Sequence, residues 1–130
     1  MIGMLIVSHS RKIAEGVQEL AEQMGQQQVL IRAAGGMSDG TLGTSAEVIH
    51  AAATQLGSTP IDGLLVLLDL GSAVLSTEMA LEGFAKPFVI SDAPLVEGAI
   101  MAVIEAAIGG DLERVAAAAE RTKTLRKLLG

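Results

Sequence analysis

The sequence predicts an α/β fold with an open, mostly parallel central sheet of about four strands and helices on both faces. Four short apolar runs alternate with stretches in which apolar residues recur at helical spacing, in the order βαβαβαβαα. Such alternation is typical of parallel strands joined by crossover helices. Half of the 130 residues are hydrophobic but only two, both Phe, are aromatic, so the core must be aliphatic. The length fits a single domain over residues 1–130.

The first half of the chain is expected to supply two strands and two helices. Residues 2–8 are almost continuously apolar, as in a parallel strand covered on both faces. Ser10 can cap the helix that follows, because its hydroxyl can accept a hydrogen bond from the first turn. The expected elements are a strand at 2–8, a helix over 11–24, a strand at 28–32, a glycine-rich loop at 33–45 and a helix over 45–56.

The second half is expected to add two strands and three helices. A helix capped by Ser72 would direct Leu75, Met79 and Ala80 into the core. The expected elements are a strand at 63–68, a helix from Ser72 to about Glu82, a strand at 86–90, a helix over 95–108 and a helix from Asp111 to about Leu128.

The predicted helix over 95–108 is apolar around more of its circumference than one sheet face requires. Two interpretations carry equal weight from this feature alone. A second copy of the chain could cover the excess apolar surface, or the helix could simply be buried within one chain.

The composition excludes several classes of function. The net charge of −6 and the pI of about 4.8 argue against nucleic-acid binding, which needs basic patches that neutralise phosphates. No apolar stretch approaches the roughly 20 residues of a membrane-spanning helix. The chain has no cysteine and so no disulfide framework or thiolate nucleophile, which suits a reducing cytoplasm.

Neither a metal nor another cofactor is expected. His50 lies three residues after Glu47, and two such side chains make a poor metal site. We therefore expect His50 at the surface or at an interface.

Three loops are expected to meet at the carboxyl edge of the sheet, where open parallel sheets bind ligands. These loops are Ser8–Ser10, Gly35–Ser45 and Asp69–Ser72. Glycine-rich turns and helix N-termini present N–H groups to phosphate oxygens. A neutral imidazole can carry a phosphoryl group, and a nearby carboxylate can orient the ring. The residues expected at this edge therefore predict a phosphoryl-transfer site, in which His9 accepts the phosphoryl group and Asp69 orients its ring.

Plainer interpretations stay open for the same residues. A single histidine at a strand end is more often an ordinary polar residue than a nucleophile. Asp69 could cap the next helix, or could itself accept phosphate as in receiver domains, although those place an acidic cluster after their first strand. Arg11 and Lys12 could steady an anion or could only flank the helix start.

Three motifs resemble the DhaM family, the phosphotransferase subunits of PTS-dependent dihydroxyacetone kinases. They are Ile6-Val-Ser-His-Ser10, Gly35-Gly-Met-Ser-Asp-Gly-Thr-Leu-Gly-Thr-Ser45 and Asp69-Leu-Gly-Ser-Ala73. The resemblance covers essentially the whole chain, and the second motif is its most specific part. The first domain of DhaM is similar to the mannose-type EIIA domain. The resemblance therefore implies a four-stranded parallel core, with room for a short extra edge strand, and a homodimer.

The resemblance also implies a function. His9 would accept a phosphoryl group from phospho-HPr and pass it to ADP held in the DhaL subunit, and the ATP formed would phosphorylate dihydroxyacetone on DhaK. The phosphoryl group would bind Nε2, with Asp69 holding Nδ1–H. Some DhaM proteins continue into HPr-like and EI-like domains. This sequence ends at Gly130, so a separate HPr is the expected donor if the chain is complete.

Ten further residues are expected to contact the phosphate or a partner protein. They are Ser10, Arg11, Gly36, Asp39, Gly40, Thr41, Gly43, Thr44, Gly71 and Ser72. Two alternative functions remain. The chain could be a mannose-type EIIA component of a sugar-transporting system, although the loop at 35–45 argues against it. It could also be a noncatalytic module that binds a small anion or nucleotide.

Overall fold

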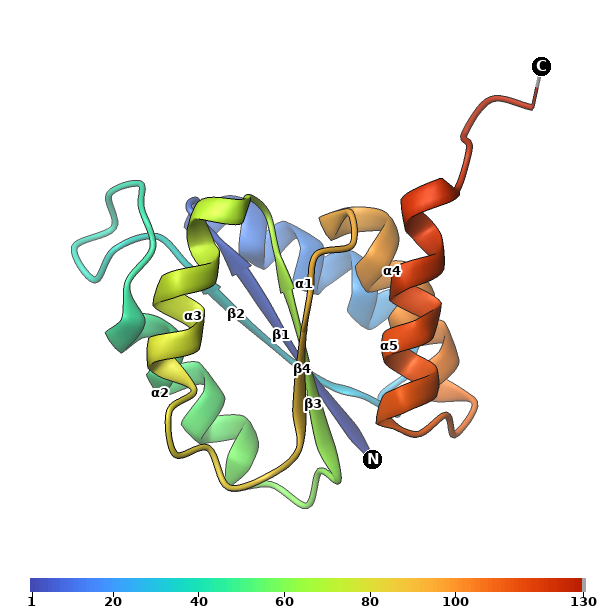
Figure 1. Cartoon of the computed structure of the whole chain (residues 1–130), viewed down its shortest axis with the longest axis horizontal. Helices are drawn as coiled ribbons and strands as arrows, with labels where there is room; N and C mark the ends of the chain where they lie inside the picture. The colour runs from blue at the N-terminus through green and yellow to red at the C-terminus, as the bar shows by residue number, and fades with distance from the viewer. Residues whose placement is uncertain (130) are drawn as a thin grey trace.

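The computed structural model describes residues 1–129 and contains one parallel sheet (Figure 1). Its strands are β1 (Ile2–Ser8), β2 (Leu30–Gly35), β3 (Gly63–Leu68) and β4 (Phe88–Ser91), in the spatial order β2-β1-β3-β4. All three strand pairs are parallel. The predicted α/β fold with a parallel four-stranded core is therefore confirmed.

Helices cover both faces of the sheet (Figure 1). One face carries α1 (Arg11–Gly25), α4 (Leu95–Ala107) and α5 (Leu112–Arg121), and the other carries α2 (Ala46–Gly57) and α3 (Val74–Ala80). Two short 3₁₀ turns complete the described elements, η1 (Gly71–Ala73) before α3 and η2 (Thr122–Thr124) after α5.

The strands are buried on both faces because their side chains alternate between two aliphatic cores. Met4 and Ile6 of β1 pack in the core beneath α1, α4 and α5. Leu5 and Val7 pack in the core beneath α2 and α3. Each of these four side chains is fully buried, which explains why the strand reads as a continuous apolar run.

The strand order places a topological switch point between β1 and β3. From β1 the chain moves outward to β2, then returns to β3 on the opposite side of β1. Adjacent loops therefore diverge at the carboxyl ends of β1 and β3, which leaves the crevice where such sheets bind ligands. The pairing of Val7 with Leu68 puts the residues that follow these two strands side by side.

Several boundaries differ from the prediction. The second strand begins at Leu30 rather than at residue 28, because Gln26 and Gln27 adopt positive φ angles of 48° and 68° and prolong the turn after α1. The last helix ends at Arg121, well before Leu128, and the chain becomes extended at Leu125 after η2.

The prediction for the helix after β3 was wrong in three respects. Ser72 is not its N-cap but lies within η1, and the α-helix runs only over Val74–Ala80. Leu75 and Met79 were expected in the core but are 68% and 56% exposed. A 3₁₀ turn advances by a different angle per residue, so it shifts the face that the next helix buries. Thr77 is buried instead, and its hydroxyl is satisfied there by donating to the Ala73 carbonyl.

The apolar excess of α4 lies on the surface of this chain. Its outward side chains are partly or largely exposed, so burial within one chain does not account for them. They are Val96, Met101, Ile104 and, just after the helix, Ile108. Among residues 1–129, no helix has the length and apolar character needed to cross a membrane.

The close packing of β2 against the start of α1 makes a testable prediction about Gly35. Gly35→Ala should lower the free energy of unfolding by about 1–3 kcal/mol. The reason is that the added Cβ would lie 2.5 Å from the Ser10 carbonyl oxygen and 2.7 Å from the Arg11 Cα.

Gly16→Ala is the matched control, since a Cβ at this exposed position in α1 would meet nothing within 4 Å. It should raise the free energy of unfolding by about 0.5–1 kcal/mol, because alanine favours a helix interior. Urea denaturation measures both changes, and equal stability of the two variants would contradict the tight contact at Gly35.

Candidate functional site

His9 lies between the end of β1 and the first turn of α1. The last ladder residue of β1 is Ser8, and Ser10 is the N-cap of α1, where its hydroxyl accepts a hydrogen bond from the Ile13 N–H at 3.2 Å. A cap of this kind begins the helix directly after the strand. His9 is therefore held at the rim of the sheet, with its side chain partly exposed.

Asp69 follows β3 and contacts His9 through both backbone and side chain. Its Oδ1 lies 3.0 Å from the His9 Nδ1, and its Oδ2 accepts the His9 backbone N–H at 2.8 Å. The two residues come together because β1 and β3 are paired in parallel register and end at the same edge. The structure thus brings together the two residues that the strand pattern placed at this rim.

The Asp69 contact determines which nitrogen of His9 is free. An ionised carboxylate only accepts hydrogen bonds, so Nδ1 must carry the ring proton. In the neutral imidazole Nε2 then has an unshared electron pair, and the Ser72 hydroxyl donates to it at 2.9 Å. The nucleophilic nitrogen therefore faces the η1 turn and the exposed rim.

The Asp69 carboxylate accepts four hydrogen bonds. Besides the two from His9, Oδ2 receives the Ser8 hydroxyl at 2.9 Å and Oδ1 receives the Leu70 N–H at 2.7 Å. Burial acts to raise the pKa of Asp69, but the hydrogen bonds from His9 and Ser8 outweigh it and hold the pKa below its ordinary value. The site thus contains a fixed negative charge against the imidazole.

The loop between β2 and α2 is anchored to the residues around His9. The Gly36 N–H donates to the Ser8 carbonyl at 3.1 Å, and the Gly43 N–H donates to the His9 carbonyl at 2.8 Å. The Thr44 hydroxyl lies 3.1 Å from that of Ser76 on α3. Both glycines have positive φ angles, 75° and 140°, which other residues rarely adopt. The loop base is thus part of the same edge as His9.

The tip of this loop is bonded to itself. The Asp39 carboxylate accepts the Thr41 N–H at 3.0 Å and the Thr41 hydroxyl at 2.6 Å, and these bonds lower the pKa of Asp39. The Gly40 N–H donates to the Met37 carbonyl. No hydrogen bond within residues 1–129 joins Asp39, Gly40 or Thr41 to the imidazole. Their contact with phosphate or a partner stays a prediction.

Two shallow hollows border residues close to the His9–Asp69 pair. One, of about 350 Å³, is lined by Arg11, Gly35 and Met37, and the Arg11 side chain there is largely exposed and 3.4 Å from Glu15. The other, of about 310 Å³, is lined by Asp69 and Gly71 among others.

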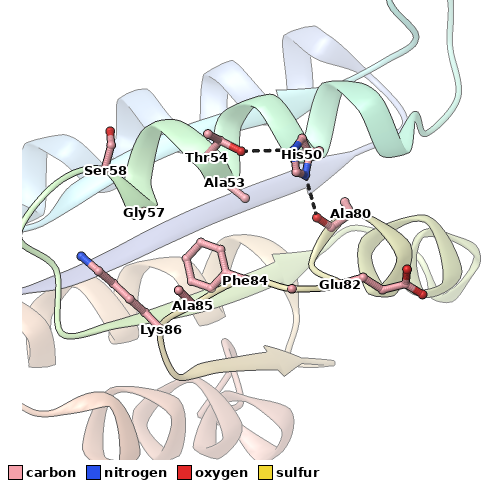
Figure 2. A pocket seen from close by; sticks show the side chains of 11 residues that line it. His50, Ala53, Thr54, Gly57, Ser58, Ala80, Glu82, Phe84, Ala85 and Lys86 are labelled. Carbon is pink, nitrogen blue, oxygen red and sulfur yellow. Dashed lines mark hydrogen bonds between the residues drawn. The ribbon is translucent and has the colours of Figure 1, made fainter.

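His50 belongs to a different part of the molecule. Figure 2 shows it on α2, where its Nδ1 lies 3.1 Å from the Ala80 carbonyl oxygen and its Nε2 lies 3.4 Å from the Thr54 hydroxyl. It borders an apolar hollow of about 330 Å³ that also contains the ring of Phe84. His50 is exposed, as predicted, and no group of three potential metal ligands occurs within residues 1–129.

The sequence interpretation missed two hydroxyl groups. Ser8 bonds to Asp69, and the partly buried Ser76 on α3 bonds to Thr44. Serine at the end of an otherwise apolar strand was the available signal for Ser8. Ser76 had no such signal, because its contact depends on how α3 is rotated.

The chain is thus an α/β domain in which the His9 imidazole, oriented by the Asp69 carboxylate, lies at the topological switch point of the sheet. The family model described as EIIA-man, PTS system fructose IIA component, matches residues 3–116. The chain therefore belongs to the EIIA-man family of the phosphotransferase system.

Two named proteins and one solved structure are similar to this chain. One is 40% identical over 119 residues, covering 88% of this chain and 94% of its own length: the PEP-dependent dihydroxyacetone kinase 2, phosphoryl donor subunit DhaM, of Listeria innocua. The phosphoryl donor subunit DhaM of Escherichia coli is 39% identical over 88% of this chain, but the match spans only 25% of that longer protein. The crystal structure of the unknown-function protein EF1359 matches with a TM-score of 0.82 and 34% identity, covering 99% of this chain and 98% of that one.

Proposed function

We propose that this chain is the phosphoryl donor subunit of a PEP-dependent dihydroxyacetone kinase and that His9 carries the phosphoryl group. The observation that carries the proposal is the His9–Asp69 pair, with Nδ1 held by the carboxylate and Nε2 at the rim. The names of the Listeria and E. coli relatives support the choice of kinase system.

The donor step needs no proton transfer from His9. The electron pair of Nε2 attacks the phosphorus of phospho-HPr, the Nε2–P bond forms and the bond from phosphorus to the donor breaks. The ring keeps its Nδ1 proton and becomes positively charged. Asp69 stabilises this charge, since its carboxylate lies 3.0 Å from Nδ1.

The η1 turn is suited to hold the transferred group. The Ser72 hydroxyl must leave Nε2 as the phosphoryl group arrives, and it can then donate to a phosphoryl oxygen. The N–H groups of Gly71 and Ser72 begin the turn and have no partner within it. The first turn of α1, with Ser10 and Arg11, adds the positive end of a helix dipole on the other side of His9.

The acceptor step reverses this chemistry with a different partner. An oxygen of the terminal phosphate of ADP, held in DhaL, attacks the phosphorus, the Nε2–P bond breaks and its electrons return to the ring. The ATP formed then phosphorylates dihydroxyacetone bound to DhaK, so this chain interacts with DhaK only indirectly. The proposal includes a cytoplasmic location, because ADP and phospho-HPr are its substrates.

The surface around His9 suits contact with other proteins. Leu42 in the β2–α2 loop is 78% exposed, and Leu70 and Leu75 beside η1 are also largely exposed. Apolar side chains that surround a reactive group provide a docking area in which charge is not required. This fits a chain of net charge −6, whose overall field cannot attract an acidic partner.

His9→Ala should abolish phosphorylation in a mixture with phosphoenolpyruvate, EI and HPr while the fold survives, because His9 is partly exposed and outside the core. Intact mass and mapping of the modified residue are the measurements. Asp69→Ala should slow the transfer by about 10–1,000-fold without abolishing it, since it removes the partner of Nδ1. Phosphate retained on the His9 variant would exclude His9 as the carrier.

A sugar-transport EIIA is the second candidate, because the matching family model is described as a fructose IIA component. We expect the phosphorylated chain to lose its phosphoryl group to DhaL with bound ADP, and to transfer it to a mannose-type EIIB domain at least about 10-fold more slowly. Quenched-flow measurement of both transfers decides between them. Faster transfer to EIIB would favour the sugar-transport function.

A homodimer is part of the proposal. The support is the exposed apolar surface of α4, formed by residues such as Val96, Met101 and Ile104. Light scattering should give twice the 13.3 kDa mass of the chain, and Ile104→Glu should shift the mass toward that of the monomer. A wild-type chain that stays monomeric at micromolar concentration would refute the dimer.

A further inference from the structure

We propose that Ser8 is a positioning residue for phosphoryl transfer, because its buried hydroxyl fixes the Asp69 carboxylate against the His9 imidazole. This inference rests on the proposed function for its consequence in catalysis, but its geometric part does not. None of the contacts predicted for the site from sequence included the side chain of Ser8.

The direction of each hydrogen bond at Ser8 follows from its partners. The Ser8 side chain is fully buried, and its Oγ accepts the Ser10 N–H at 3.0 Å. Its single proton is then available for Asp69 Oδ2 at 2.9 Å, and a carboxylate can only accept. An amide donor on one side of the hydroxyl strengthens its donation on the other.

The Ser8 hydrogen bond limits rotation of the carboxyl group. The Asp69 Oδ1 lies 3.0 Å from Nδ1 of His9, and Oδ2 lies 3.2 Å from it, so the ring proton could bond to either oxygen. Ser8 and the His9 backbone N–H both bond Oδ2 and occupy its two lone pairs, whereas Oδ1 accepts the Leu70 N–H and keeps one lone pair for the ring. Loss of the Ser8 hydroxyl leaves Oδ2 with contacts to His9 alone, through its backbone N–H and its ring.

The chain contains a close internal control at the end of another strand. Ser91 ends β4 as Ser8 ends β1, and it is 5% exposed. Its hydroxyl oxygen also accepts the N–H two residues later, from Ala93 at 3.2 Å. No carboxylate is bonded to Ser91 within residues 1–129. Ser8→Ala and Ser91→Ala therefore remove the same local contact, and only the first removes a donor to Asp69.

The experiment compares these two variants with the full wild-type chain. Three quantities are measured: the single-turnover rate of phosphorylation by phospho-HPr, the ¹³C titration of the Asp69 carboxyl group, and the ¹⁵N shifts of the His9 ring. In Ser8→Ala we expect transfer about tenfold slower, a higher pKa for Asp69 and a larger fraction of the ring protonated on Nε2. Ser91→Ala should match the wild type in all three.

The two NMR measurements need no partner protein, so they separate this inference from the proposed function. A wild-type chain that accepts no phosphate, with Asp69 and His9 signals altered only in Ser8→Ala, would refute the proposed function and keep the positioning role. Unchanged signals in Ser8→Ala, or equal slowing in both variants, would overturn the positioning role even if His9 is phosphorylated.

Discussion

The parallel pairing of β1 with β3 is the constraint on which the rest of the site depends. The backbone register places Ser8 and His9 beside Asp69 with no other element between them. The carboxylate then accepts hydrogen bonds from residues at the ends of both strands. The orientation of the imidazole ring therefore depends on the backbone positions of His9 and Asp69 as well as on the chemistry of their side chains. A small domain with only two aromatic residues can hold an imidazole this firmly because the two strands beneath it are buried on both faces.

The strands and the His9–Asp69 pair could be predicted from the sequence, since both follow from local signals. Fully buried parallel strands read as continuous apolar runs, and parallel strands end at a common edge. The α3 face could not be predicted, because the 3₁₀ turn at Gly71–Ala73 rotates the helix and leaves Leu75 and Met79 exposed. Glycine content indicated a loop at 33–45, but not that Asp39 would bond to Thr41 and stay apart from His9.

Short hydroxyl side chains do much of the positioning here. Ser10 caps α1, Ser72 is hydrogen-bonded to the His9 Nε2, and Ser8 donates to the Asp69 carboxylate. Each occupies a position where serine is common for local reasons, at a cap, in a turn or at a strand end. Sequence alone therefore gives little means to recognise that Ser8 and Ser72, unlike Ser10, also contact residues some sixty positions away.

The bridge between Gly36 and Thr44 closes the β2–α2 loop at its base. Within the closed loop, Gly43 next to the bridge is bonded to His9, whereas the tip at residues 37–41 makes its hydrogen bonds internally. The segment thus combines residues that hold His9 with a tip that no hydrogen bond within residues 1–129 ties to the imidazole. Substitutions in the tip should therefore leave the His9–Asp69 contact intact, so the tip is free to vary in sequence while the residues at its base are not.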